Sequence, residues 1–179
     1  MQINLITSNL SKVREFKEIL KGKVKINHIQ MEYKELRSDN PLEIAKEAAK
    51  RLAEELQKAV VVEDSGMFIK ALNDFPGTCS SYIHKRIGLQ GILKLMGKID
   101  DRTAYYKSAV AYCEPGKEPI GFLGEEKGYV AEKIRGNYGF GHDPIFIPEG
   151  SSKAYGEIKD CERLKKFRRI AVEKLMEYL

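Results

Sequence analysis

The feature that most constrains the fold of this chain is a run of three valines, Val60–Val62, that leads directly into Glu63, Asp64, Ser65 and Gly66. Continuous β-branched apolar runs are typical of strands buried on both faces, in α/β sheets that helices cover on both sides. Ligands of open α/β sheets bind beyond the carboxyl ends of the strands. We therefore expect a buried strand that ends at the last valine and presents two carboxylates, a hydroxyl and a glycine to a ligand. The alternative is a solvated turn, because Asp-Ser-Gly is also ordinary turn chemistry.

Carboxylates in this position suit metal-assisted hydrolysis, since they can hold Mg²⁺ and a water molecule. The polar segment after the second expected strand adds further carboxylates at Glu32, Glu35 and Asp39. Mg²⁺ usually takes one or two protein carboxylates together with substrate phosphates and water. Any one of the three could therefore complete a metal site with Asp64. A polar surface loop is the alternative, and the spacing does not choose among the three residues.

Hydrophobic spacing predicts alternating strands and helices in the first half of the chain and antiparallel strands in the second half. The expected strands cover residues 3–7, 24–28, 60–62, 67–72, 104–113, 120–126, 128–134 and 145–147, and the expected helices cover 10–20, 41–56, 80–86, 89–96 and 161–179. Asn9 can cap the first helix, and Asn40 with Pro41 marks the start of the second. In the last helix we expect Leu164 to face the core. The pattern predicts an α/β fold with a mixed β-sheet flanked by helices, in a single domain over residues 1–179.

Composition limits the classes of protein to which the chain can belong. With 179 residues, 42% of them hydrophobic, it is long enough for one domain with a sizeable core. Its 31 Lys and Arg against 26 Asp and Glu give a net charge of +5, which suits an anionic ligand such as a nucleotide. These cations are spread along the chain, so we expect no stable nucleic-acid partner. We also expect no membrane association, because no apolar run approaches the roughly 20 residues of a membrane span and the N-terminus does not resemble a signal peptide.

The cysteines Cys79, Cys113 and Cys161 are odd in number and far apart in the sequence. No C-x-x-C pair occurs, so neither a zinc site nor a disulfide framework is indicated. Reduced thiols are typical of proteins inside cells, and we expect a cytoplasmic protein. His28 and His84 have no partners at the spacing of metal ligands and are expected to be structural or surface residues.

The junction between the first strand and the first helix is a candidate phosphate site. It consists of Thr7, Ser8, Asn9, Leu10, Ser11 and Lys12. The start of a helix offers free backbone N–H groups and the positive end of the helix dipole. The segment is not a Walker loop, because the glycines are missing. Taken alone, it favours the alternative of a capped helix with a solvated lysine.

A glycine-rich segment over residues 136–144 is a candidate base-binding loop. It carries aromatic rings at Tyr138 and Phe140 and polar side chains at His142 and Asp143. An aromatic ring can stack on a nucleobase, an interaction of about 1–3 kcal/mol per base, and a carboxylate can accept hydrogen bonds from a base edge. The alternative is a β-turn whose aromatic rings belong to the core.

In this order, the segments resemble the inosine/xanthosine triphosphate pyrophosphatase family over nearly the whole chain. The motifs that carry the resemblance are Thr7-Ser8-Asn9-x-x-Lys12-x-x-Glu15, Val62-Glu63-Asp64-Ser65-Gly66, Phe75-Pro76-Gly77-x-x-Ser80 and Gly139-Phe140-Gly141-His142-Asp143-Pro144-Ile145-Phe146. Each motif is weak alone, but their combination is highly specific. The resemblance implies hydrolysis of the purine nucleoside triphosphates ITP, dITP and XTP to the monophosphate and pyrophosphate, with Mg²⁺. It also implies an elongated α/β protein whose long mixed sheet forms a central nucleotide-binding cleft between two lobes, and a homodimer.

The resemblance further implies roles for individual residues. Asp64 is the general base and a metal ligand, and Glu35 is the second metal carboxylate, with Asp39 and Glu32 as alternatives. The nucleotide-binding residues that it implies are Thr7, Ser8, Asn9, Leu10, Ser11, Lys12, Lys46 and Ser65 on the phosphate side, Phe140, Gly141, His142 and Asp143 around the base, and Arg168.

Base selection would follow from the edge that the purine presents to the pocket. Phe140 is expected to stack on the base, and Asp143 or nearby backbone is expected to read the 6-oxo edge. A 6-oxopurine presents a ring N–H and a carbonyl where adenine presents the reverse. A polar pocket can exploit that mismatch, because buried unpaired groups are costly.

The chain departs from the family pattern before its last helix. The family has a Lys-Asn pair followed by Ser-His-Arg, whereas here Glu162 stands in place of the lysine and Phe167 in place of the histidine, with Arg168 retained. The departure leaves two other functions open. One is a pyrophosphatase for pyrimidine or modified nucleoside triphosphates, and the other is a catalytically weak nucleotide- or nucleic-acid-binding protein.

Overall fold

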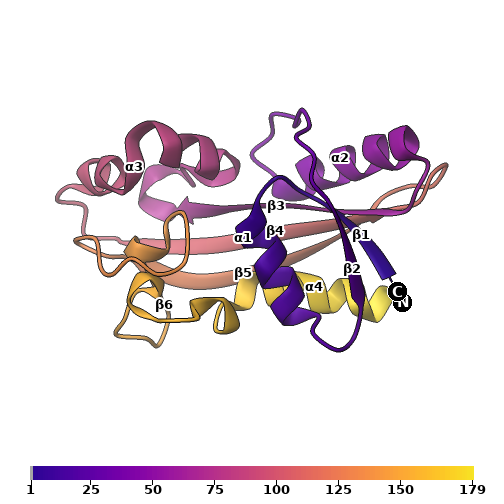
Figure 1. Cartoon of the computed structure of the whole chain (residues 1–179). Helices are drawn as coiled ribbons and strands as arrows, with labels where there is room; N and C mark the ends of the chain where they lie inside the picture. The colour runs from indigo at the N-terminus through magenta and orange to yellow at the C-terminus, as the bar shows by residue number, and fades with distance from the viewer. Residues whose placement is uncertain (1) are drawn as a thin grey trace. The chain divides into compact units, whose positions relative to one another are not determined.

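The computed structural model describes residues 2–179, which form a six-stranded mixed sheet with helices (Figure 1). In chain order the main elements are β1 (Gln2–Ile6), α1 (Leu10–Ile19), β2 (Lys25–Ile29), α2 (Pro41–Leu56), β3 (Val60–Ile69), α3 (Ser80–Met96), β4 (Thr103–Cys113), β5 (Ile120–Val130), β6 (Phe146–Pro148) and α4 (Lys166–Tyr178). The strand order is β2-β1-β3-β4-β5-β6, with β1 parallel to β2 and β3, and β5 antiparallel to β6. The prediction of a mixed α/β sheet is therefore confirmed.

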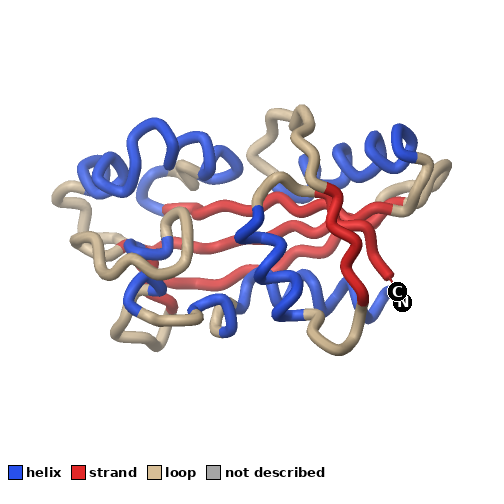
Figure 2. The backbone as a smooth tube through the Cα atoms, viewed as in Figure 1, coloured by secondary structure: helices blue, strands red, loops and turns tan. Residues whose placement is uncertain are grey.

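The described chain divides into two compact units. The first comprises residues 2–64, 108–124 and 167–179, and the second comprises residues 65–107 and 125–166. The strands β3, β4 and β5, drawn among the red segments in Figure 2, each contribute residues to both units.

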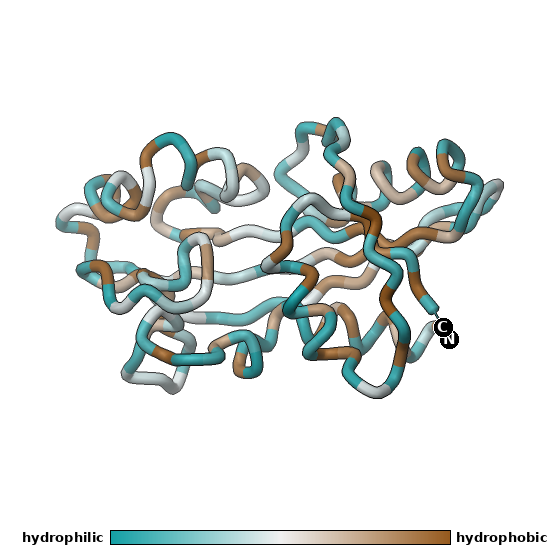
Figure 3. The backbone as a smooth tube through the Cα atoms, in the orientation of Figure 1, coloured by the Kyte–Doolittle hydropathy of each residue, from teal (hydrophilic) through white to brown (hydrophobic). Residues whose placement is uncertain are grey.

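In the first unit, the strands place side chains alternately into two apolar clusters. One cluster joins Leu5, Val61 and Val110 to residues of α1 and α4. The other joins Ile6 and Val62 to residues of α2, which covers the opposite face of the sheet (Figure 1). Along α1 and α4 apolar and polar residues alternate (Figure 3), as one buried face per helix requires. Successive strand residues point to opposite faces, so the valine run is buried on both sides, as predicted.

Both expected helix starts are confirmed. Asn9 caps α1, and Asn40 caps α2 with Pro41 at the first helical position. The Asn40 side chain accepts a hydrogen bond of 3.0 Å from the Leu42 N–H group. A cap of this kind contributes about 1 kcal/mol to stability relative to alanine.

The strand that carries the valine run continues beyond the predicted end. It is one strand, β3, up to Ile69, so Glu63, Asp64, Ser65 and Gly66 lie inside it and not in a turn. The separate strand expected over residues 67–72 is the second half of β3, followed by a 3-10 turn. The backbone ladder tolerates polar residues whose side chains find partners elsewhere in the fold. The local sequence does not reveal such partners.

Two other boundaries differ from the prediction. The strands expected over 120–126 and 128–134 are one strand, β5, in which Glu126 stays buried because it accepts hydrogen bonds from the Tyr155 hydroxyl and the Lys166 N–H group. The last helix begins at Lys166, after a 3-10 turn, and not at residue 161. Leu164 lies in the segment before the helix and is 53% exposed, so the expectation that it faces the core is wrong. The helices expected over 80–86 and 89–96 are confirmed, because they are the two parts of α3, which is broken at Gly88.

The cysteines are free thiols. The side chain of His28 lies 2.9 Å from the carbonyl oxygen of Thr7, and so has a structural partner. Over residues 2–179, no helix combines the length and the apolar character that crossing a membrane requires.

Candidate active site

Glu63 and Asp64 are neighbours in β3, so their side chains point to opposite faces of the sheet. Val61 packs with α1 and α4, and Val62 packs with α2. By the same alternation, Glu63 faces α1 and α4, whereas Asp64 faces the side of α2. Both are buried, with 3% and 6% of their surface exposed. The two carboxylates therefore have separate surroundings, which the expectation of a strand-end turn did not foresee.

Tyr33 marks the acidic surroundings of Asp64 in the first unit. The pKa of its phenol is raised, first by burial and then by the negative charges of Glu35, Glu63 and Asp64. Tyr33 also packs beside the apolar cluster on the α2 side, the face toward which Asp64 points. Glu35 and Asp64 thus act on one phenol, although they come from a loop and from a strand. Tyr33 could not be predicted as part of the site, because a lone tyrosine in a polar loop carries no motif.

Asp64 and Glu35 carry carboxylate oxygens, the hard donors that Mg²⁺ prefers. Among residues 2–179, no three His, Cys, Asp or Glu side chains converge in a way that would hold a metal. Mg²⁺ needs only one or two protein carboxylates when phosphate oxygens and water supply the remaining ligands. The oxygen donors of Asp64 and Glu35 are of the chemical type that such a site uses.

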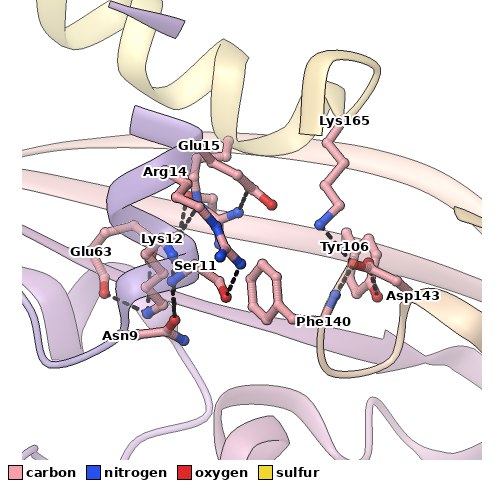
Figure 4. Close-up of polar contacts among 12 residues, drawn as sticks. Asn9, Ser11, Lys12, Arg14, Glu15, Glu63, Tyr106, Phe140, Asp143 and Lys165 are labelled. Atoms are coloured by element: carbon pink, nitrogen blue, oxygen red, sulfur yellow. Dashed lines mark hydrogen bonds and ion pairs between the residues drawn. The ribbon is translucent and has the colours of Figure 1, made fainter. Parts of the chain in front are cut away.

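On the opposite face of β3, Glu63 is the centre of a buried charge network (Figure 4). Its Oε1 atom accepts hydrogen bonds from the Ser108 hydroxyl at 2.7 Å and from Arg168 Nε at 3.0 Å. Lys12 Nζ lies 2.7 Å from Oε2 and donates to the backbone carbonyl of Glu63 at 3.0 Å. The alternative of a solvated lysine is therefore wrong, because Lys12 reaches back from α1 to the strand.

Arg168 joins this network to Glu15 of α1. Its guanidinium donates to both Glu63 and Glu15, and the arginine is 1% exposed. Burial lowers the pKa of Arg168 to about 9, which still leaves the group charged at neutral pH. Two cations and two carboxylates thus neutralise each other inside the first unit. In this structure the arginine anchors α4 to β3 and α1.

The expected phosphate segment is internally capped. Asn9 Oδ1 accepts hydrogen bonds from the N–H groups of Ser11 at 2.9 Å and Lys12 at 3.3 Å, and the Asn9 N–H group donates to Thr7 Oγ1 at 3.1 Å. These amides are therefore engaged within the segment, which confirms the capped helix that the segment alone favours. Ser8 and Leu10 are exposed on the same segment.

One cation beside this segment was missed. Arg14 is exposed and donates a hydrogen bond of 3.0 Å to the Ser11 hydroxyl (Figure 4).

The side chain of Lys46 in α2 packs beside Gly121 of β5. A Cβ atom added to this glycine would lie 3.2 Å from the aliphatic part of Lys46. Ser65 directly follows Asp64 in β3 and is half-buried.

In the second unit, the structure gathers side chains around Asp143, which is 2% exposed. Its Oδ2 atom accepts hydrogen bonds from the Phe140 N–H group at 2.7 Å and from Lys165 Nζ at 2.8 Å, and Oδ1 accepts one from the Tyr106 hydroxyl at 3.0 Å (Figure 4). A Cβ atom at Gly139 would approach Oδ2 to 2.1 Å, and the φ of Gly139 is +74°, so this turn requires glycine. The predicted loop therefore does bring Phe140 and Asp143 together.

Lys165 is the residue of this cluster that sequence reasoning missed. It is 2% exposed, and its ammonium lies 4.4 Å from the centroid of the Phe140 ring. In the family pattern a lysine stands at the position of Glu162, and this chain lacks it there. The turn before α4 instead carries Lys165 inward to Asp143, whereas the neighbouring Lys166 is exposed.

His142 lies in the same loop and is 4% exposed. Its Nε2 atom is buried and has no hydrogen-bond partner among the described residues. The ring packs edge-on against His84 of α3, with 5.2 Å between the centroids. Burial, together with the neighbouring charge of His84, lowers the pKa of His142 to about 4, so its imidazole is neutral at neutral pH.

Comparisons with known proteins agree on one family. A model of the Ham1 family matches residues 3–178. The dITP/XTP pyrophosphatase of Methanopyrus kandleri is 44% identical over 180 residues, which are 99% of this chain and 96% of the relative. The dITP/XTP pyrophosphatase of Methanosarcina acetivorans is 41% identical over 179 residues, with the same coverage of both chains. Among solved structures, a HAM1 protein from Coxiella burnetii superposes with a TM-score of 0.84 at 25% identity and covers 98% of both chains.

Proposed function

The chain belongs to the Ham1 family, and from that premise we propose that it hydrolyses ITP, dITP and XTP to the nucleoside monophosphate and pyrophosphate. The names of the Methanopyrus and Methanosarcina relatives support this activity. The observation that carries the proposal is the buried pair of Asp143 and Lys165, in which an acceptor and a donor lie 2.8 Å apart. Such a pair is complementary to the ring N–H and carbonyl groups on the edge of a 6-oxopurine.

In the base pocket, Asp143 accepts a hydrogen bond from the ring N–H group of the base, and Lys165 donates to the 6-oxo group. Adenine presents an acceptor and a donor in the reverse order, so its ring nitrogen would face the Asp143 carboxylate and its amino group the Lys165 ammonium, and neither group of the base would form a hydrogen bond. An unpaired buried group costs about 1–3 kcal/mol, which is enough to disfavour ATP strongly. Phe140 stacks on the base, and Gly141 and His142 complete the loop.

In the first unit, Asp64 is the general base of the reaction. It accepts the proton of a water molecule that attacks the α-phosphorus, while pyrophosphate leaves. Asp64 and Glu35 would hold Mg²⁺, which withdraws charge from the phosphate oxygens when bound. Glu35 is the second metal carboxylate that the family resemblance implies, with Asp39 and Glu32 as alternatives.

The phosphates are assigned to the start of α1 and to nearby cations. Thr7, Ser8, Asn9, Leu10, Ser11 and Lys12, with Lys46 and Ser65, form this phosphate-side set. Asn9 caps the helix in the structure, so binding exchanges internal hydrogen bonds for bonds to phosphate. Arg14 adds an exposed positive charge at the same segment. Arg168 acts on the nucleotide indirectly. It donates a hydrogen bond to Glu63, and the other carboxylate oxygen of Glu63 is paired with Lys12.

A homodimer completes the proposal, and it rests on the family resemblance alone. The cytoplasmic location is proposed from the free cysteines. Sedimentation equilibrium of the purified chain measures the mass directly. A monomer at micromolar concentration would remove the dimer from the proposal and leave the activity untouched.

The test of the activity is pyrophosphate release from ITP, XTP, dITP, ATP, GTP and dTTP, with Mg²⁺ and with a chelator. We expect metal-dependent release from the first three and poor release from ATP and dTTP. Poor release from GTP, whose base has the same ring N–H and 6-oxo edge, would show that the pocket also reads the 2-position of the purine. Release mainly from dTTP would show that the pocket selects a pyrimidine. No release from any nucleotide, with salt-sensitive binding retained, would favour a binding protein without catalysis.

A further inference from the structure

Three aromatic rings stack in sequence in the second unit. The Tyr106 and Phe146 rings lie 4.0 Å apart at 23°, and the Phe146 and Tyr155 rings lie 6.0 Å apart at 12°. The tyrosine at each end donates to a buried carboxylate, Tyr106 to Asp143 at 3.0 Å and Tyr155 to Glu126 at 2.5 Å. The stack therefore holds two carboxylates, of which only Asp143 belongs to the candidate base pocket.

The two oxygens of Asp143 are held from different directions. Oδ2 is held from within its own loop by the Phe140 N–H group and from the C-terminal segment by Lys165. Oδ1 is held by the hydroxyl of Tyr106, which comes from β4. The torsion that turns a carboxylate about its Cβ–Cγ bond has a broad energy profile. A carboxylate held through one oxygen can therefore turn, whereas one held through both has a fixed plane.

We propose that Tyr106 is a positioning residue for base selection, because its hydroxyl fixes the plane of the Asp143 carboxylate and hence the direction of its remaining lone pair. This inference rests on the proposed assignment of Asp143 to the base pocket. Tyr106 itself is 6% exposed and does not need to touch the nucleotide. Its ring is held by Phe146, so the hydroxyl has a defined position.

The donor character of Tyr106 persists over the working range of pH. Burial raises the pKa of its phenol well above the ordinary value, and the neighbouring charge of Asp143 acts in the same direction. The hydroxyl therefore stays protonated, and it does not ionise when a nucleotide binds. Its contribution to Asp143 is constant, as a positioning role requires.

A fixed acceptor separates 6-oxopurines from adenine more sharply than a mobile one. The ring N–H group of inosine meets the fixed lone pair directly, whereas the ring nitrogen of adenine brings a second lone pair against it. If the carboxylate could turn, it would move away from adenine and relax that penalty. Loss of the Tyr106 hydroxyl should therefore weaken discrimination, while the phosphate chemistry at Asp64 continues.

The test compares Tyr106→Phe with Tyr155→Phe. Each substitution keeps a ring of the stack and removes one hydroxyl that donates to a buried carboxylate, so the second is a matched control for lost stability. Steady-state kcat and KM for ITP and ATP are measured for both variants and the wild type, below their melting temperatures. We expect the ITP-to-ATP ratio of kcat/KM to fall about tenfold in Tyr106→Phe, the effect of one hydrogen bond. We expect kcat for ITP to stay within about twofold, with KM for ITP raised, and the ratio to be unchanged in Tyr155→Phe.

An unchanged ratio in Tyr106→Phe, from a wild type that discriminates, would overturn the positioning role and leave the proposed function standing. An equal fall in both variants would also overturn it, because the effect would then follow from lost packing. A wild type that hydrolyses ITP and ATP equally well would instead refute the base pocket itself.

Discussion

The buried arginine of the first unit allows a direct measurement of how much the charge network contributes to stability. Arg168→Met keeps most of the aliphatic volume and removes the guanidinium that Glu15 and Glu63 share. All three side chains are 1% exposed, so the two carboxylates would stay buried without this cation. Breaking a buried ion pair by removing one partner costs about 3–5 kcal/mol. At about 2–4 °C per kcal/mol for a chain of this size, the melting temperature should fall by about 6–20 °C.

Arg169→Met is the matched control for this substitution. Arg169 is the next residue of α4, its side chain is 33% exposed, and its guanidinium lies 3.9 Å from Glu173. Exposed pairs of this kind contribute about 0–1 kcal/mol, so the control should melt within about 4 °C of the wild type. Thermal and urea unfolding followed by circular dichroism at pH 7.5 measure both variants under the same conditions.

A double variant separates the ion pair from simple packing. Glu15→Gln and Arg168→Met disrupt the same buried pair, so their combined loss of stability should be clearly smaller than the sum of the single losses. Equal melting temperatures for the Arg168 and Arg169 variants would refute the network. Strict additivity of the Glu15 and Arg168 losses would show that the two side chains do not stabilise one another.

Three further outcomes test the site. Asp64→Asn should lower kcat for ITP at least about 100-fold, because a general base contributes about 10²–10⁴-fold, while equilibrium binding of the nucleotide persists; near-normal turnover would contradict the assigned role. Lys165→Met should lower the ITP-to-ATP ratio of kcat/KM about tenfold or more. The control Lys166→Met, at an exposed position, should leave this ratio unchanged. Identical ratios in the two variants would exclude Lys165 from base selection. The pKa of His142 is lowered from 6.5 to about 4, chiefly by burial, so between these values the unfolded chain takes up a proton that the folded chain does not. The stability present above pH 6.5 is then lost as the pH falls, by about 2 kcal/mol at pH 5 (1.5 units at about 1.36 kcal/mol each). Urea unfolding at pH 7.5 and pH 5 measures this loss, which His142→Phe should abolish; the same loss in both proteins would assign it to other groups.

The order and type of most elements could be predicted from the sequence. Apolar spacing and the caps at Asn9 and Asn40 are local signals, and the structure confirms both helices that they start. The two errors in strand boundaries occurred where a buried polar residue interrupted an apolar run. Glu63 in β3 and Glu126 in β5 were taken to end strands, but each strand continues because its carboxylate has partners. Those partners come from distant segments, so no local pattern announces them.

The candidate site was predictable in its components more than in its arrangement. The loop that carries Phe140 and Asp143 was identified from its glycines and aromatic rings, and their contact is present. Lys165 and Tyr106 were missed, since neither stands at a position that the family pattern marks.

The sequence by itself determined the period of each segment, the helix starts and the family, because these depend on neighbouring residues or on their linear order. The tertiary structure alone decided which charges share a buried environment. Arg168 and Glu15 are 153 residues apart, and Lys165 and Asp143 are 22 apart, yet each pair is enclosed together. Burying a charge is tolerable only beside a partner of opposite sign. The partners meet only in the folded chain. Their pairing allows charged residues, which usually lie on the surface, to be buried in this protein.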